Sequence, residues 1–178
     1  MTSNLLKAAF FLGAVAAFAP VAAVSGEAPK KGNKTFDIQY VYRPVGYSEV
    51  PGVGKITVLE SIGKAANLKG DSVPFKDGFT SKCQMVSIEA GGKTWTEGAC
   101  VVNDGDGDLI FSTFDSRNLD TLQPKLNCGS YVSTGGTGKF KGFSAAGAYS
   151  CAMAEAPKDA PAGGFAMVVA HNENWQTN

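Results

Sequence analysis

Three aspartates alternate with glycines in the stretch VVNDGDGDLIFSTFD. Asp104, Asp106 and Asp108 have the spacing of the first oxygen ligands of a helix-loop-helix calcium site. That site also needs glycine at its sixth position and glutamate at its twelfth, where this chain has Leu109 and Asp115. The stretch therefore indicates a turn between two strands, because Asp and Gly favour capped and positive-φ turn positions. Weak ion binding is the alternative, since a cation would relieve repulsion among three close carboxylates.

Four cysteines are the next residues with chemical potential. A Gly-Gly pair lies midway between Cys83 and Cys100, and Gly-Gly between two alternating runs predicts a hairpin with a two-residue turn. This register places Cys83 opposite Cys100 in a non-hydrogen-bonded pair, with Cα atoms about 4.5 Å apart and within disulfide range. Cys128 and Cys151 then pair by elimination. Zinc is the alternative, but the chain has no CxxC pair and one histidine.

The hairpin register also separates two faces, and one of them is mainly apolar. That face carries Gln84, Val86, Ile88, Ala90, Trp95, Glu97, Ala99 and Val101. Because one face of such a hairpin can be dry, we expect this face to point to the core. Glu97 is then predicted to point inward, where a carboxylate must be paired, hydrated or protonated. A solvated carboxylate paired with Arg43 or Arg117 is the alternative.

Few other side chains suggest a reaction. His171 is expected at the end of the last strand, where a lone imidazole is more often exposed or hydrogen-bonded than a base. Tyr40 and Tyr42 share a strand face with apolar residues and are expected in the core or along a lumen. No residue set identifies a reaction or a cofactor, so Glu97 is the one weak catalytic candidate and enzymatic activity is left open.

The elements that must position these residues are strands. Strand-length runs rich in β-branched and aromatic residues are TFDIQYVY, GKITVLES, DLIFSTFD and GGFAMVVAH. Residues 61–68 could form a helical turn at best, and residues 155–163 are expected to be an exposed loop. Several strands at this spacing predict an all-β barrel or sandwich.

The N-terminal sequence predicts export. An apolar run, AAFFLGAVAAFAPVAAVSG, follows MTSNLLK and ends in small residues, as in a secretory signal cleaved after Ala23 or Ser25. A membrane anchor is the alternative, but Pro20 interrupts a run that is already short for a span. The predicted divisions are a signal peptide (1–25), a flexible segment (26–35), a β-barrel domain (36–171) and a C-terminal tail (172–178). A secreted or periplasmic location would favour disulfides.

Charge excludes some partners. The chain has 16 basic and 16 acidic residues, and signal cleavage would remove one basic residue, Lys7. A net charge near zero gives no general attraction to nucleic acid or to anionic membranes, and the longest basic run is Lys30-Lys31. About 150 residues remain, enough for one domain with its own core. We therefore expect no nucleic-acid partner and no membrane span after cleavage.

One segment carries a family resemblance. STGGTGKFKGFSAAGAYSC, residues 133–151, resembles the glycine-rich signature of the allene oxide cyclase and dirigent barrel families, where a GGTG turn leads to a phenylalanine, a glycine and a strand. Exported bacterial proteins similar to this family also have a preceding C…D.DGD segment, matched here by Cys100 and the aspartate stretch. The resemblance implies an eight-stranded antiparallel barrel, calycin-like and similar in shape to lipocalins, whose lumen can hold one small apolar ligand.

The resemblance does not fix the function, because these families include cyclases, proteins that orient radical coupling of phenolics, and members without known activity. A binding barrel for a small apolar ligand, without a cofactor, is the first hypothesis. Its candidate contacts are Tyr40, Tyr42, Trp95 and Glu97. A lumen isomerase or cyclase that uses Glu97 is the second, since an interior glutamate steers the reaction in allene oxide cyclases. The third is a structural or host-interaction protein with a filled barrel. Relatives often form dimers or trimers, so a homo-oligomer is left open.

Overall fold

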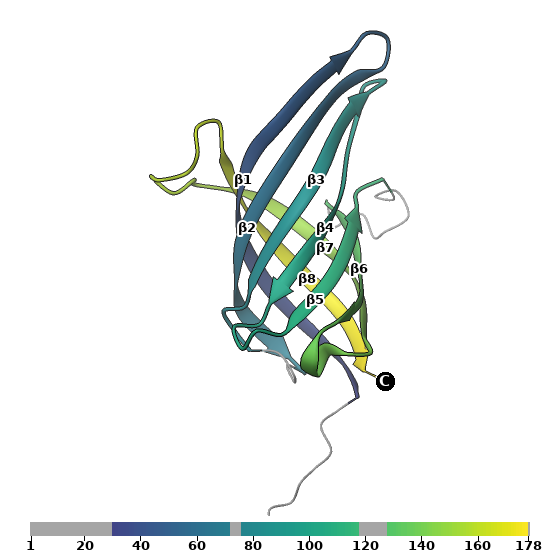
Figure 1. Cartoon of the computed structure of the whole chain (residues 1–178), viewed down its shortest axis with the longest axis vertical. Helices are drawn as coiled ribbons and strands as arrows, with labels where there is room; N and C mark the ends of the chain where they lie inside the picture. Colours follow the sequence, from purple (N-terminus) through teal and green to yellow (C-terminus); the bar gives the residue numbers. More distant parts are fainter. Residues whose placement is uncertain (1–29, 72–75, 118–127, 178) are drawn as a thin grey trace, which may run out of the picture.

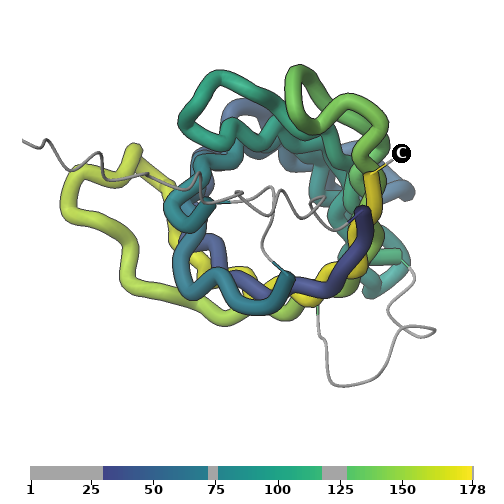
Figure 2. Tube along the Cα trace, turned by 90° about the horizontal axis from the view of Figure 1, so that it is seen from below, coloured from purple at the N-terminus to yellow at the C-terminus, as the bar shows by residue number. Residues whose placement is uncertain are grey.

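The computed structural model describes residues 30–71, 76–117 and 128–177. Eight antiparallel strands follow one another around a closed barrel, and the last pairs with the first (Figure 1). The strands are β1 (Lys31–Val50), β2 (Gly54–Gly70), β3 (Thr80–Ala90), β4 (Lys93–Asn103), β5 (Leu109–Asp115), β6 (Gly129–Gly136), β7 (Phe143–Ala154) and β8 (Phe165–Thr177). Seen from below, the chain forms one closed ring (Figure 2). The predicted all-β, eight-stranded antiparallel barrel is confirmed.

The first and last strands extend beyond the predicted barrel. β1 begins at Lys31, inside the segment 26–35 expected to be flexible, and β8 continues to Thr177. Lys34 pairs with Glu173 in this added section, and both side chains are buried. The section is therefore part of the barrel wall, because its inward residues complete the interior. The predicted signal peptide lies outside the described residues.

Other local predictions have mixed outcomes. Residues 61–68 belong to β2 and form no helical turn, because their inward side chains alternate with exposed ones as in any barrel strand. Residues 155–163 form the expected loop between β7 and β8. Within the described segments, no helix is long and apolar enough to cross a membrane.

The β3–β4 hairpin has the predicted register, with Cys83 opposite Cys100. Cys83 and Cys100 form one disulfide, and Cys128 and Cys151 form the other, with Cα–Cα distances of 4.1 and 5.7 Å. Both predicted pairings are confirmed. The first disulfide joins two strands of one hairpin and the second connects β7 to the residue before β6, so each strengthens a neighbouring contact of the barrel.

The face predicted to be buried is the wrong one. Cys83 is 3% exposed and Met85 is also buried inside the barrel, whereas Val101 is 41% exposed on the outer surface. The register is unchanged, so no β-bulge caused the error. Disulfide sulfurs and methionine are themselves apolar and favour the interior. The serines and threonines on the same face of the hairpin as the cysteines line a cavity. Their hydroxyl groups therefore do not have to be buried in a packed apolar core.

The lower end of the barrel in Figure 1 has its own apolar cluster. A short 3₁₀ turn, η1 (Gly138–Phe140), begins at the last glycine of the GGTG sequence and places the fully buried Phe140 there. Phe140 packs edge to face with Phe143, with ring centroids 5.9 Å apart, in a cluster that includes Trp175. The glycine-rich turn thus contributes an aromatic side chain to the lower end of the barrel.

Candidate functional site

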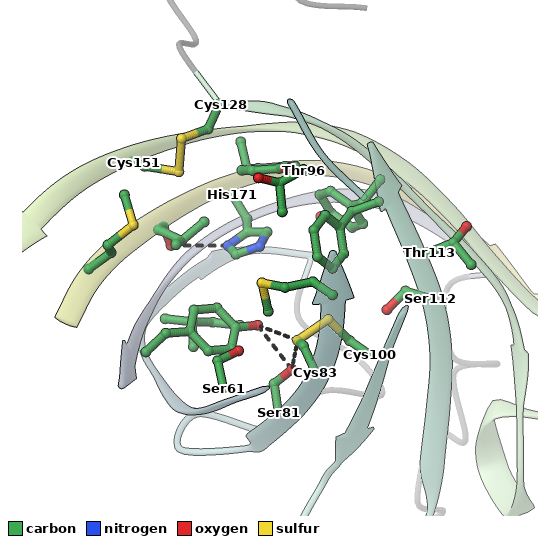
Figure 3. Close-up of a pocket in the computed structure, with 18 of the residues that line it drawn as sticks. Ser61, Ser81, Cys83, Thr96, Cys100, Ser112, Thr113, Cys128, Cys151 and His171 are labelled. Carbon is green, nitrogen blue, oxygen red and sulfur yellow. Dashed lines mark hydrogen bonds between the residues drawn. A yellow bond between two sulfur atoms is a disulfide. The ribbon is translucent and has the colours of Figure 1, made fainter. Parts of the chain in front are cut away.

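The barrel encloses a cavity of about 380 Å³. This volume lies in the range of small-molecule sites, which are concave, mostly apolar and furnished with a few polar groups. Aromatic rings from several strands form much of its wall, including those of Phe36, Tyr40, Tyr42, Tyr131, Tyr149 and Phe165. Figure 3 shows hydroxyl groups and both disulfides among the residues around the same space. The lumen is therefore the candidate site.

Three of the four predicted ligand contacts lie at this cavity. Tyr40, Tyr42 and Trp95 all border it, although Trp95 belongs to the outward-facing set of β4 together with Glu97 and Val101. The ring of Tyr42 stacks on that of Phe165, with centroids 4.7 Å apart and planes 5° from parallel. The ring of Tyr42 is thus held in place by a neighbour, and the role of the three residues in ligand binding stays a prediction.

Glu97, the fourth, is not in the lumen, so the prediction that it points into the barrel is wrong. Its carboxylate lies 2.6 Å from the guanidinium of Arg117, and its side chain is 40% exposed. Arg117 also pairs with Asp115, whereas Arg43 pairs with Glu60. The alternative of a solvated carboxylate paired with Arg117 is confirmed. A catalytic or ligand-binding role for Glu97 inside the lumen has no geometric basis.

The lumen contains a different carboxylate, that of Glu173. Lys34 Nζ lies 2.9 Å from Glu173 Oε1, and the two side chains are 2% and 4% exposed. The hydroxyl group of Tyr131 donates a hydrogen bond of 2.6 Å to Glu173 Oε2. These three residues and Gly147 occupy one row across β6, β7, β8 and β1. Gly147 leaves room for two neighbours, because an added Cβ would lie 2.2 Å from the backbone carbonyl oxygen of Asn172 and 3.0 Å from Tyr131 Cε1.

Burial shapes the electrostatics of this row. Desolvation lowers the pKa of Lys34 to about 8, although Glu173 opposes the change by attraction and hydrogen bonding. The Lys34 ammonium also lies 4.9 Å from the ring centroid of Phe36. Desolvation and the charge of Glu173 raise the pKa of Tyr131 well above its ordinary value. At neutral pH Lys34 therefore keeps its proton and Tyr131 is a neutral phenol.

His171 occupies the next inward position on β8 and lines the cavity. Its ring stacks on Phe36, with centroids 4.6 Å apart, and meets Tyr131 edge to face at 5.2 Å. Burial lowers its pKa to about 4, even though the carbonyl oxygen of Val169, 3.1 Å from Nδ1, acts in the other direction. The ring is only half-buried by surface area because it borders the cavity. At neutral pH this is an uncharged imidazole in an aromatic wall.

A chain of hydroxyls ends on the Cys83–Cys100 disulfide (Figure 3). Tyr40 donates to Ser81 Oγ over 2.9 Å, and Ser81 Oγ lies 3.6 Å from Cys83 Sγ. Because a disulfide sulfur carries no proton, the serine hydroxyl is the donor in the second contact. Burial raises the pKa of Tyr40 to about 12, so its phenol stays protonated. Ser61 Oγ, in contrast, is buried with no hydrogen-bond partner among the described residues.

The aspartate stretch forms a turn between β4 and β5, as predicted. Asp104 Oδ1 accepts hydrogen bonds from the backbone N–H groups of Asp106 and Asp108, at 2.9 and 3.1 Å. Gly105 and Gly107 supply φ angles of 88° and 99°, which favour glycine. The Asp104 carboxylate thus accepts hydrogen bonds from the backbone of its own turn, as in a turn capped by an aspartate side chain.

Lysines neutralise this turn. Lys139 pairs with Asp104 and lies 3.0 Å from Asp106, and Lys76 lies 2.6 Å from Asp106. The hydrogen bonds from Lys76 and then Lys139 lower the pKa of Asp106. Among the described residues, no group of three or more His, Cys, Asp or Glu side chains could hold a metal ion. The lysines therefore supply the positive charge that a cation would otherwise bring.

Sequence reasoning missed the polar groups inside the lumen. Lys34 has the same strand parity as Phe36, and Glu173 has the same parity as Val169 and His171. Extending the period of two past each apolar run would have placed these charges inside the barrel. The contact between Tyr131 and Glu173 could not be found in this way, since it depends on the order of strands around the barrel.

Comparisons with protein-family models, with curated proteins and with solved structures found no match for this chain. The resemblance to allene oxide cyclase and dirigent barrels therefore stays an expectation based on the GGTG segment. The function must be inferred from the lumen itself.

Proposed function

We propose that this protein is an exported binding protein whose barrel holds one small, mainly apolar ligand. The observation that carries the proposal is the cavity of about 380 Å³ with its largely aromatic wall. Burial of apolar ligand surface against such a wall contributes roughly 25 cal/mol per Å² before the cost of association. Two disulfides support export, because oxidising compartments favour them. The cavity also favours binding over the alternative of a filled, purely structural barrel.

A lumen reaction is the second candidate, and Glu173 replaces Glu97 as its residue. A buried ammonium, carboxylate and phenol in one row are groups that can orient or protonate a substrate. A buried ion pair is weak as a means of stabilising a fold, since well-packed apolar residues often do as well. The presence of this pair beside the cavity therefore supports a task there. Binding remains the first proposal because the aromatic wall that carries it comes from several strands, whereas the charged row occupies one part of the cavity.

Native mass spectrometry of the protein purified from its own host tests the binding function. We expect a fraction of molecules to carry one added small molecule that is released when the barrel unfolds. Ser133 lines the cavity and Thr134 is exposed on the outer face of the same strand, so they form a matched pair. Ser133→Phe should remove the added mass and Thr134→Phe should keep it. Equal retention by both variants would place the bound molecule outside the lumen.

A further inference from the structure

One ring nitrogen of His171 is committed to the backbone and the other is available. Nδ1 lies 3.1 Å from the carbonyl oxygen of Val169. A carbonyl oxygen can only accept, so Nδ1 carries the proton and Nε2 of the neutral ring holds a lone pair. No hydrogen bond to Nε2 is formed by the part of the chain that the structure describes. The lumen thus contains an unused hydrogen-bond acceptor.

The position of this acceptor is fixed before any ligand arrives. The imidazole lies 7° from parallel with the ring of Phe36 and 78° from that of Tyr131. The ring of Tyr149 lies on another side, with its centroid 6.0 Å away. In Figure 3 the imidazole lies inside the barrel wall, with a dashed hydrogen bond at one ring nitrogen and none drawn at the other. A rigid acceptor lowers the entropy cost of binding a ligand that donates to it.

The lumen offers no counter-ion to a charged ligand. Among the described residues that line the cavity, Lys34 and Glu173 alone carry formal charges at neutral pH. They lie 2.9 Å apart and neutralise each other. A ligand carboxylate or ammonium would lose its hydration without gaining an unpaired opposite charge, and such desolvation is costly. The surrounding aromatic faces instead suit flat, uncharged rings.

We infer that the lumen selects uncharged ring compounds that carry an N–H or O–H donor, and that Nε2 of His171 accepts the hydrogen bond. This inference rests on the proposed binding function and adds the chemical class of the ligand. The aromatic wall supplies affinity for the ring, and the imidazole distinguishes a donor-bearing ring from one without a donor. Lys34 and Glu173 remain paired when such a ligand is bound.

Isothermal titration calorimetry of the full mature protein with three indoles tests the inference. Indole has an N–H donor, 1-methylindole lacks it, and indole-3-acetate adds a negative charge. We expect indole to bind about threefold to tenfold more tightly than 1-methylindole, the range that one hydrogen bond contributes. Indole-3-acetate should bind at least about tenfold more weakly than indole, because its carboxylate has no free counter-ion.

Two variants assign the acceptor. His171→Phe keeps a ring and removes the lone pair, so the ratio of affinities for indole and 1-methylindole should fall to about one while 1-methylindole still binds. Thr134→Phe, on the exposed outer face of β6, is the control and should keep the wild-type ratio. Near-ultraviolet circular dichroism confirms that each variant keeps its packed aromatic groups.

The outcomes separate the inference from the binding function. Equal affinities for indole and 1-methylindole in the wild type, or a preference that survives in His171→Phe, would overturn the inference and leave lumen binding intact. Indole-3-acetate binding as tightly as indole would also overturn it. Failure of all three compounds to bind would overturn both the inference and the proposed function for ligands of this size.

Discussion

At the scale of the residue, the most demanding feature is the buried pair of Lys34 and Glu173. Both side chains are almost fully buried, and their attraction offsets the loss of hydration that each suffers. Removal of one partner takes away the closest opposite charge of the other. Replacing one residue of the pair should therefore lower the stability of the barrel much more than replacing both with apolar residues.

A double-mutant cycle measures this dependence. Glu173→Leu should lower the free energy of unfolding by about 3–5 kcal/mol, because it removes the carboxylate that pairs with Lys34 and accepts the hydrogen bond of Tyr131. Adding Lys34→Met should recover most of that loss. Urea denaturation of both single variants and the double variant gives the coupling energy. Losses that simply add would show that the charges do not interact.

His171 should make the protein sensitive to mild acid. Its pKa is about 4 in the folded state and near 6.5 when unfolded, so between these values the unfolded chain binds more protons and stability falls as pH falls. From pH 7 to pH 5 the loss should be about 2 kcal/mol, above the range where carboxylates titrate. His171→Phe should remove this slope in denaturation curves recorded across that interval. An unchanged slope would contradict the buried neutral imidazole.

The residues also show what sequence reasoning could reach. The cysteine pairing followed from the hairpin register, which is a local property of the turn between two strands. Glu97 was misplaced because the choice of inner face depends on what the barrel encloses. A hollow barrel can have serine and threonine on its inner face. The alternation of side chains along β3 and β4 therefore separated two faces but did not show which one pointed inward.

At the scale of the element, β7 works through the absence of a side chain. Gly147 lies between Tyr131 and Glu173 in one row across three strands, and the phenol passes over it to reach the carboxylate. Gly147 of β7 thus serves the polar row of the lumen. This role could not be predicted from the sequence, because it involves three strands at once.

Gly147→Ala should force β7 away from the carbonyl oxygen of Asn172, 2.2 Å from the added Cβ, and should also crowd the ring of Tyr131, which hydrogen-bonds Glu173 over 2.6 Å. We expect a loss of about 1–3 kcal/mol in the free energy of unfolding, as for other overpacked sites. Ala146→Ser, on the exposed face of the same strand, is the control and should change stability by less than about 0.5 kcal/mol. Chemical denaturation distinguishes them. Equal stabilities of the two variants would contradict the close packing around Gly147.

The turn between β4 and β5 should show little response to calcium. Lys76 and Lys139 already pair with its aspartates, so a cation would have to displace them. Thermal melts with and without millimolar calcium should coincide within about one degree. A rise of several degrees that is lost in Asp106→Asn would instead reveal a cation site.

Runs such as DLIFSTFD were correctly predicted as strands, whereas the lengths of β1 and β8 could not be predicted because they depend on pairing between the first and last strands of the barrel.

At the scale of the whole molecule, closure of the barrel creates the site. Each strand contributes alternate side chains to one lumen, and η1 adds Phe140 to the cluster at the lower end. The GGTG segment predicted the barrel through a family resemblance, and the barrel is present. The volume and polarity of the lumen could not be predicted, because they depend on the inward residues of all eight strands together.

The most direct test of the binding function is a fluorescence titration with prodan, an uncharged naphthalene dye whose emission shifts to the blue in apolar surroundings. One dye should bind per barrel with a blue shift in the wild type and in Thr134→Phe. Ser133→Phe should abolish the shift, because its ring would occupy the cavity that Ser133 lines. An equal blue shift and affinity in Ser133→Phe, or no shift in the wild type, would contradict a ligand-binding lumen.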